Sequence, residues 1–145
     1  MKDELVTFET AKLAKEKGFD IEVYFTWLIH HTGETLWDDF EECQFGKIEE
    51  KDNHNSYLYR YSAPTQSLLQ RWLREECGID VNIFTMGIFM DKTVQPHSNF
   101  KLVKGFKKYH YSINADTGKS PFGFDSHEGA LEEGLITALK LIKND

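Results

Sequence analysis

Residues 62–83 constrain the fold most, because they predict a helix that runs directly into a strand. Pro64 suits the first turn of a helix, where its missing N–H costs nothing. The apolar residues of the predicted helix recur at the spacing of one face: Leu68, Leu69, Trp72, Leu73 and Cys77. Gly78 suits the left-handed position after a helix, with Ile79 folding back on the last turn. Residues 79–90 then predict a strand that is apolar on both faces in its second half.

A similar succession of helix, glycine and strand is predicted earlier in the chain. Thr7 can cap a helix that extends through Lys17, and Gly18 can end it. Residues 21–29 alternate between apolar and polar side chains, as a strand with one apolar face does. The runs at 18–25 and 78–84 resemble each other, which admits two interpretations. They form either a duplicated unit or, as we favour, two helix exits that share the same turn chemistry.

The remaining segments carry weaker patterns. Residues 30–55 are polar and acidic, and we expect an exposed loop there with a short strand over 36–40. Residues 56–61 predict a strand, and so do residues 100–113, with a bulge at Lys104-Gly105. A last helix starts near Asp125 or Ser126, with Glu128 as the capping partner if Asp125 is the cap. Its expected buried stripe is Leu131, Leu135, Ala138, Leu139 and Ile142.

Within that last helix, two glycines at 129 and 134 lower the helix propensity by about 1 kcal/mol each relative to alanine. They can instead allow close approach to a sheet. Taken together, the segments follow the order α-β-β-β-α-β-β-α. This order predicts a two-layer α+β fold with a mostly antiparallel sheet and about three helices, packed mainly on one face. With 145 residues, the chain fits a single domain over 1–145.

Composition excludes several classes of protein. The net charge of −7 argues against a general nucleic-acid binder, which needs a basic surface. No apolar run approaches the roughly 18 residues of a membrane span. The charged start of the chain lacks the apolar stretch of a signal peptide. The two cysteines, Cys43 and Cys77, form no spaced motif, so we expect reduced thiols and a cytoplasmic location.

Three segments resemble a known group of proteins. Residues 6–19 read VTFETAKLAKEKGF, residues 63–75 read APTQSLLQRWLRE, and residues 128–135 read EGALEEGL. In this order they are similar to the opening, central motif and closing helix of small uncharacterised proteins of phages and prophages. The closing helix departs from that pattern, with His127 and Gly129 in place of an aromatic residue and a glutamate. The resemblance implies a phage or prophage origin and no activity that can be carried over.

Candidate metal and acid–base residues are few. His30, His31 and Glu34 lie close in sequence, as in some zinc or nickel sites. Neighbouring strand residues point to opposite faces, however, so the two histidines would not chelate together, and we expect no metal or cofactor. Asp38, Asp39, Glu41 and Glu42 can bind a cation or work as acid and base, but such a charge run is usually a solvated face.

The strongest candidate binding element is the lysine–aromatic strand at 100–111. Its residues are Phe100, Lys101, Lys104, Phe106, Lys107, Lys108, Tyr109, His110 and Tyr111. One interpretation, which we favour, is that the aromatics fill the core while the lysines protect an exposed edge. A second is contact with the acidic residues of another copy, Asp38, Asp39, Glu41 and Glu42. A third is nucleic-acid binding by stacking and phosphate contacts.

The sequence therefore predicts a non-catalytic protein-interaction module of phage or prophage origin, which can include self-association. The alternative is a nucleic-acid-associated protein that uses residues 100–111. An enzyme is the weakest hypothesis, because no set of nucleophile, acid and base can be assembled from these residues.

Overall fold

The computed structural model describes residues 3–31, 41–87, 107–114 and 123–144. Its elements follow the order that the sequence predicts. They are α1 (Phe8–Glu16), β1 (Val23–His31), β2 (Glu41–Asp52), a 3₁₀ turn η1 (His54–Ser56), β3 (Arg60–Ser62), α2 (Gln66–Cys77), β4 (Val81–Gly87), β5 (Lys107–Ile113) and α3 (His127–Leu141).

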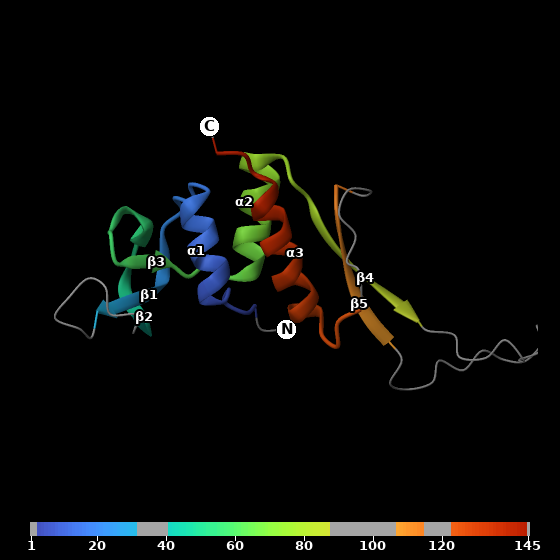
Figure 1. Ribbon diagram of the computed structural model, residues 1–145, viewed down its shortest axis with the longest axis horizontal. Helices are drawn as coiled ribbons and strands as arrows, with labels where there is room; N and C mark the ends of the chain where they lie inside the picture. Colours follow the sequence, from blue (N-terminus) through green and yellow to red (C-terminus); the bar gives the residue numbers. More distant parts are fainter. Residues whose placement is uncertain (1–2, 32–40, 88–106, 115–122, 145) are drawn as a thin grey trace, which may run out of the picture.

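The α+β fold is confirmed, and all strand pairs are antiparallel. The strands form two sheets rather than one: a three-stranded sheet in the order β2-β1-β3, and the β4-β5 pair. The helices lie between these sheets (Figure 1). Helix α1 packs on β3, whereas α3 packs on β4 and β5. The helical layer thus packs against one sheet through α1 and against the other through α3.

Local capping explains where the helices begin and end. Thr7, Thr65 and Ser126 are the N-caps, and each side-chain oxygen accepts a backbone N–H three residues on. Gly78 has a φ of 66°, and the N–H of Ile79 donates to the carbonyl of Leu73 at 2.9 Å. The predicted exit of α2 is confirmed. Ser126, one of the two predicted starts of α3, is its cap, so the pairing of Glu128 with Asp125, which required Asp125 as the cap, does not apply.

Three local predictions are wrong. Pro64 precedes the cap of α2 instead of lying in its first turn, and its carbonyl accepts the N–H of Val6 at 3.0 Å. The strand predicted over 56–61 is a turn, and only Arg60–Ser62 is extended. Residues 41–52 form strand β2 where we expected an exposed acidic loop, because β1 supplies a partner for residues 41–47 and for Asp52. The strand over 36–40 and the bulge at Lys104-Gly105 lie outside the described residues.

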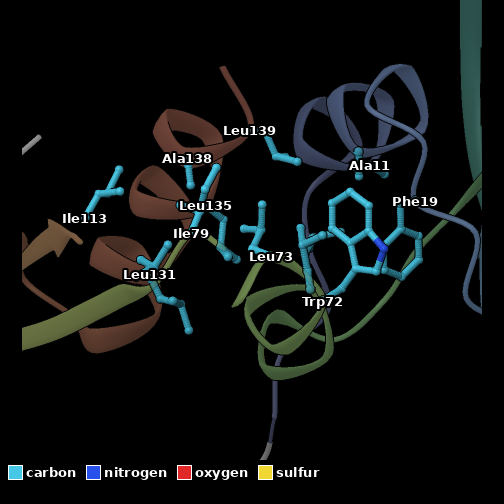
Figure 2. Close-up of a cluster of buried hydrophobic side chains, with 14 of the residues drawn as sticks. Ala11, Phe19, Trp72, Leu73, Ile79, Ile113, Leu131, Leu135, Ala138 and Leu139 are labelled. Atoms are coloured by element: carbon cyan, nitrogen blue, oxygen red, sulfur yellow. The ribbon is translucent and has the colours of Figure 1, made fainter. Parts of the chain in front are cut away.

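The core lies between the helices and reaches both sheets (Figure 2). Leu69 and Leu73 of α2 face Leu135 and Leu139 of α3, and all four are fully buried. On the α1 side, Phe19 packs edge-on against Trp72 with ring centroids 5.4 Å apart. The predicted stripes of α2 and α3 are confirmed, except that Leu68, Cys77 and Ile142 are only partly buried.

A polar cluster around Glu132 ties the three helices together. Its Oε1 accepts the backbone N–H of Thr7 at 2.8 Å, the hydroxyl of Thr7 at 2.6 Å and the hydroxyl of Thr10. Its Oε2 accepts the amide of Gln66 at 2.8 Å. Thr10 and Gln66 are both buried, and this carboxylate is the charged acceptor for both, although the Gln66 amide also donates to the carbonyl of Glu128 at 3.1 Å.

We predict that Glu132→Ala lowers the free energy of unfolding by about 3 kcal/mol, because the buried donors of Thr10 and Gln66 lose a charged acceptor. Urea denaturation measures the change. Glu133→Ala is the control, since Glu133 is exposed on the same helix. Equal effects of the two substitutions would show that the cluster contributes nothing specific.

Gly134 gives a second prediction. A Cβ at this position would lie 2.8 Å from Cγ1 of Val81 and 3.1 Å from Cβ of Tyr111. We expect Gly134→Ala to destabilise the protein by about 1–3 kcal/mol through overpacking, despite the better helix propensity of alanine. Thermal unfolding measures it. A raised melting temperature would mean that β4 and β5 can move away from α3 without cost.

Candidate functional site

The aromatic face is a cluster of rings on the three-stranded sheet and the start of α1. Its residues are Phe8, Phe25, Trp27, Phe45 and Tyr61, and they come from four elements. Trp27 of β1 lies directly opposite Phe45 of β2 and Tyr61 of β3. Residues opposite each other in a sheet share one face, so this register brings the rings into a row.

The rings pack closely across the strands. Phe25 and Phe45 are stacked, with centroids 5.4 Å apart and 13° between the planes. Trp27 contacts Phe45 edge-on at 5.1 Å. At the other end of the row, Phe8 of α1 lies 5.3 Å from Tyr61 and 6.1 Å from Trp27. These contacts hold the rings of β1 and β2 in fixed positions relative to one another.

Helix α1 covers only one end of this row. Phe8 and Tyr61 lie where α1 packs on β3, whereas Phe45 on β2 keeps 46% of its surface exposed. Lys47 places its ammonium 6.0 Å from the ring centre of Phe25. The indole Nε1 of Trp27 is buried and has no hydrogen-bond partner within the described part of the chain. The uncovered end thus combines exposed aromatic surface with a nearby cation.

Lys15 fixes the segment next to this face. Its ammonium donates to the carbonyls of Tyr57 and Arg60, the latter at 2.8 Å, and lies 4.6 Å from the ring centre of Tyr61. Burial lowers the pKa of Lys15 below its usual value. Lysine side chains are usually solvated, so these contacts indicate a structural role for Lys15 in holding residues 57–60 on the sheet.

The opposite face of the sheet is built differently. Tyr24 is 42% exposed there, with Lys51 at 5.2 Å from its ring centre. His54 is fully buried, and its Nε2 lies 3.0 Å from the carbonyl oxygen of Val23. This contact anchors the turn η1 to β1.

The structure separates the residues of the predicted lysine–aromatic strand. Tyr111 is buried in the core, and its hydroxyl lies 3.0 Å from that of Thr137. Lys108 forms an ion pair with Asp125, and His110 stacks on Phe84 at 5.6 Å. The backbone of Tyr109 pairs with Phe124, which covers the outer edge of β5 at that point. Lys107 lies within β5, while Phe100, Lys101, Lys104 and Phe106 lie outside the described residues.

The acidic and histidine candidates are also divided. Glu41 and Glu42 belong to β2, opposite His31 and His30 of β1. Glu34, Asp38 and Asp39 lie outside the described residues. Across the ranges that the structure describes, no group of three histidine, cysteine or acidic side chains is placed to hold a metal ion. Burial and the charge of Glu76 raise the pKa of the half-buried Cys77 thiol.

Comparisons with protein-family models, curated proteins and solved structures found no match. The resemblance to phage and prophage proteins therefore stays a prediction. Within the described ranges, none of the helices has the length and apolar character needed to cross a membrane.

The aromatic face was missed because Phe45 sits in a segment that reads as an acidic loop. The alternation of residues 21–29 did identify the apolar side of β1. The alternating apolar residues of this segment are Ile21, Val23, Phe25, Trp27 and Ile29. A nine-residue helix is too short to cover all five, and this mismatch was the sequence signal for an uncovered apolar face.

We predict that Lys15→Ala destabilises the protein by about 1–3 kcal/mol, because the carbonyls of residues 57–60 lose a charged donor. It should also increase hydrogen exchange of the backbone amides of residues 60–62. Lys12→Ala, at an exposed position of the same helix, is the control. Unchanged exchange in Lys15→Ala would refute the anchoring role.

Proposed function

We propose that this protein is a non-catalytic protein-binding domain and that the aromatic face is its binding surface. One observation carries the proposal: Phe45 stays 46% exposed although it stacks on Phe25 and contacts Trp27 edge-on. A ring held rigidly by neighbouring rings but left open to water is costly to keep unless a partner covers it.

Aromatic side chains favour protein partners for two reasons. They are enriched in the buried centres of interfaces, where a few rings contribute most of the binding free energy. The rings here also lose little conformational freedom on binding, because β1 and β2 already fix them. Nearby Lys47 adds a cation that can select a partner with an acidic residue next to its apolar anchor.

Charge argues against nucleic acid at this surface. Glu49 and Glu50 are exposed on the same strand as Phe45, and the whole chain carries a net charge of −7. Phosphate groups would be repelled. The nucleic-acid alternative on residues 100–111 stays a prediction, as do the phage or prophage origin and the cytoplasmic location.

Site-specific photo-crosslinking tests the proposal. A benzophenone amino acid replaces Phe45 in the full chain, and the variant is irradiated in cells of the native host. The matched control carries the same amino acid in place of Tyr24, which has similar exposure on the opposite face. We expect a discrete protein adduct from position 45 and none from position 24.

A second variant guards against misinterpretation. Phe45→Ala should leave the melting temperature within a few degrees of the native value, because the side chain is half exposed. When the benzophenone is placed at the neighbouring position Lys47, Phe45→Ala should reduce the yield of the same adduct at least several-fold. Equal adducts from positions 45 and 24, or none from 45, would refute the aromatic face as a protein-binding surface.

A further inference from the structure

The two edges of the three-stranded sheet differ in their hydrogen bonding. At the β3 edge, the N–H of Ser62 donates to the side chain of Asn55 at 2.8 Å. The carbonyl of Arg60 accepts the ammonium of Lys15 at 2.8 Å, and its N–H points to the carbonyl of Tyr57 at 3.5 Å. Strand β3 is therefore closed to any further strand.

Strand β2 forms the other edge, and the pairing pattern shows which of its groups point outward. The N–H of Ala63 donates to the carbonyl of Phe25, and the N–H of Ile29 donates to the carbonyl of Tyr59. Odd-numbered residues of β1 thus direct their backbone groups toward β3. Because these directions alternate, the even-numbered residues face β2.

It follows that Gly46 and Gln44 of β2 bond to β1, opposite Thr26 and Leu28. The backbone N–H and C=O groups of Cys43, Phe45 and Lys47 point away from the sheet. Among the described residues, no backbone hydrogen bond outside the β1–β2 pairing involves Phe45 or Lys47. As far as the described residues go, this edge is open, and it borders the exposed ring of Phe45.

We propose that β2 pairs with β2 of a second copy, antiparallel about a two-fold axis at Gln44. The two sheets would then join into one six-stranded sheet. This inference names a partner for the proposed protein-binding surface and so rests on that proposal.

The regular part of β2 determines the register. Residues 41–47 pair with β1 without interruption, whereas the register shifts between Phe25–Lys47 and Val23–Asp52. Residues 48–51 have no partner in β1, and because such irregularities disrupt a ladder, we place the new pairing at residues 41–47. Gln44 is the midpoint of this stretch. Pairing about Gln44 lets the whole regular part of each copy take part.

The charges fit the same register. With the axis at Gln44, Lys47 of one copy lies opposite Glu41 of the other, twice by symmetry, and Phe45 lies opposite Cys43. An axis at Phe45 would place Lys47 opposite Cys43 and Glu41 opposite Glu49, and like charges opposite each other destabilise a pair. Charge complementarity therefore selects a second copy and this alignment.

The dimer would also extend the aromatic face. Antiparallel partners about an axis perpendicular to the sheet keep the same face on the same side. Phe45 of one copy would lie diagonally from Phe45 of the other, at roughly 7–8 Å. The two aromatic faces then form one continuous surface, with Phe45 covered at its centre.

Sedimentation equilibrium of the full chain tests the association, and a cysteine scan tests the register. The scan uses a chain with Cys43→Ser and Cys77→Ala, to which Gln44→Cys, Gly46→Cys or Lys47→Cys is added. A non-hydrogen-bonded antiparallel pair has Cα atoms about 4.5 Å apart, which suits a disulfide across the axis. We expect a concentration-dependent dimer, and oxidation to a covalent dimer at least tenfold faster for Gln44→Cys than for the other two.

Charge reversal gives an independent readout. Lys47→Glu should raise the dissociation constant about tenfold, because it places two like-charge pairs across the interface. The double variant Glu41→Lys/Lys47→Glu should restore the native value. A substitution that merely disturbed the strand would not be rescued in this way.

Each outcome separates this inference from the proposed function. A chain that stays monomeric to several hundred micromolar overturns the dimer, as does a dimer whose fastest disulfide is not at position 44. The protein-binding proposal survives either result if position 45 still crosslinks to another protein in cells. An absence of any adduct from position 45 overturns both.

Discussion

The carboxylate of Glu132 is the interaction on which the rest of the arrangement depends. It accepts the N–H of Thr7 at the start of α1, where the helix dipole favours a negative charge. It also accepts hydrogen bonds from the buried side chains of Thr10 and Gln66. One residue of α3 thus helps to position both α1 and α2. Phe8 follows Thr7 directly. Glu132 of α3 therefore helps to determine where the start of α1, with Phe8, lies on the aromatic face.

The helices could be predicted because their signals are local. Thr65 and Gly78 delimit α2 through hydrogen bonds within a few residues, and its stripe has the period of a helix. Strand β2 has no such signal, since its acids and lysines lack strand propensity and it is extended because β1 pairs with it. Tyr111 shows the same limit. Alternation places it on one face of β5, but only the packing of α3 decides that this face is the core.

The candidate site lay beyond sequence reasoning for the same reason. The rings of the aromatic face come from four separate elements, and only the register joins Trp27 to Phe45 and Tyr61. The sequence pointed instead to a run of lysines and aromatics, where proximity along the chain is visible. In the described part of that run, Tyr111 is buried in the core and Lys108 forms an ion pair with Asp125.

The two edges of the small sheet show how specificity can be built from backbone groups. Asn55 and Lys15 occupy the outward backbone groups of β3 with side-chain hydrogen bonds, and the far end of β2 is irregular and carries charged residues, features that disfavour strand addition. Such measures prevent uncontrolled strand addition. They leave open one short regular segment that carries Phe45 at its outer side. Among the described residues, the sheet is protected at β3 and left open beside the half-exposed ring of Phe45, which is the form expected of an interface limited to one partner in one register.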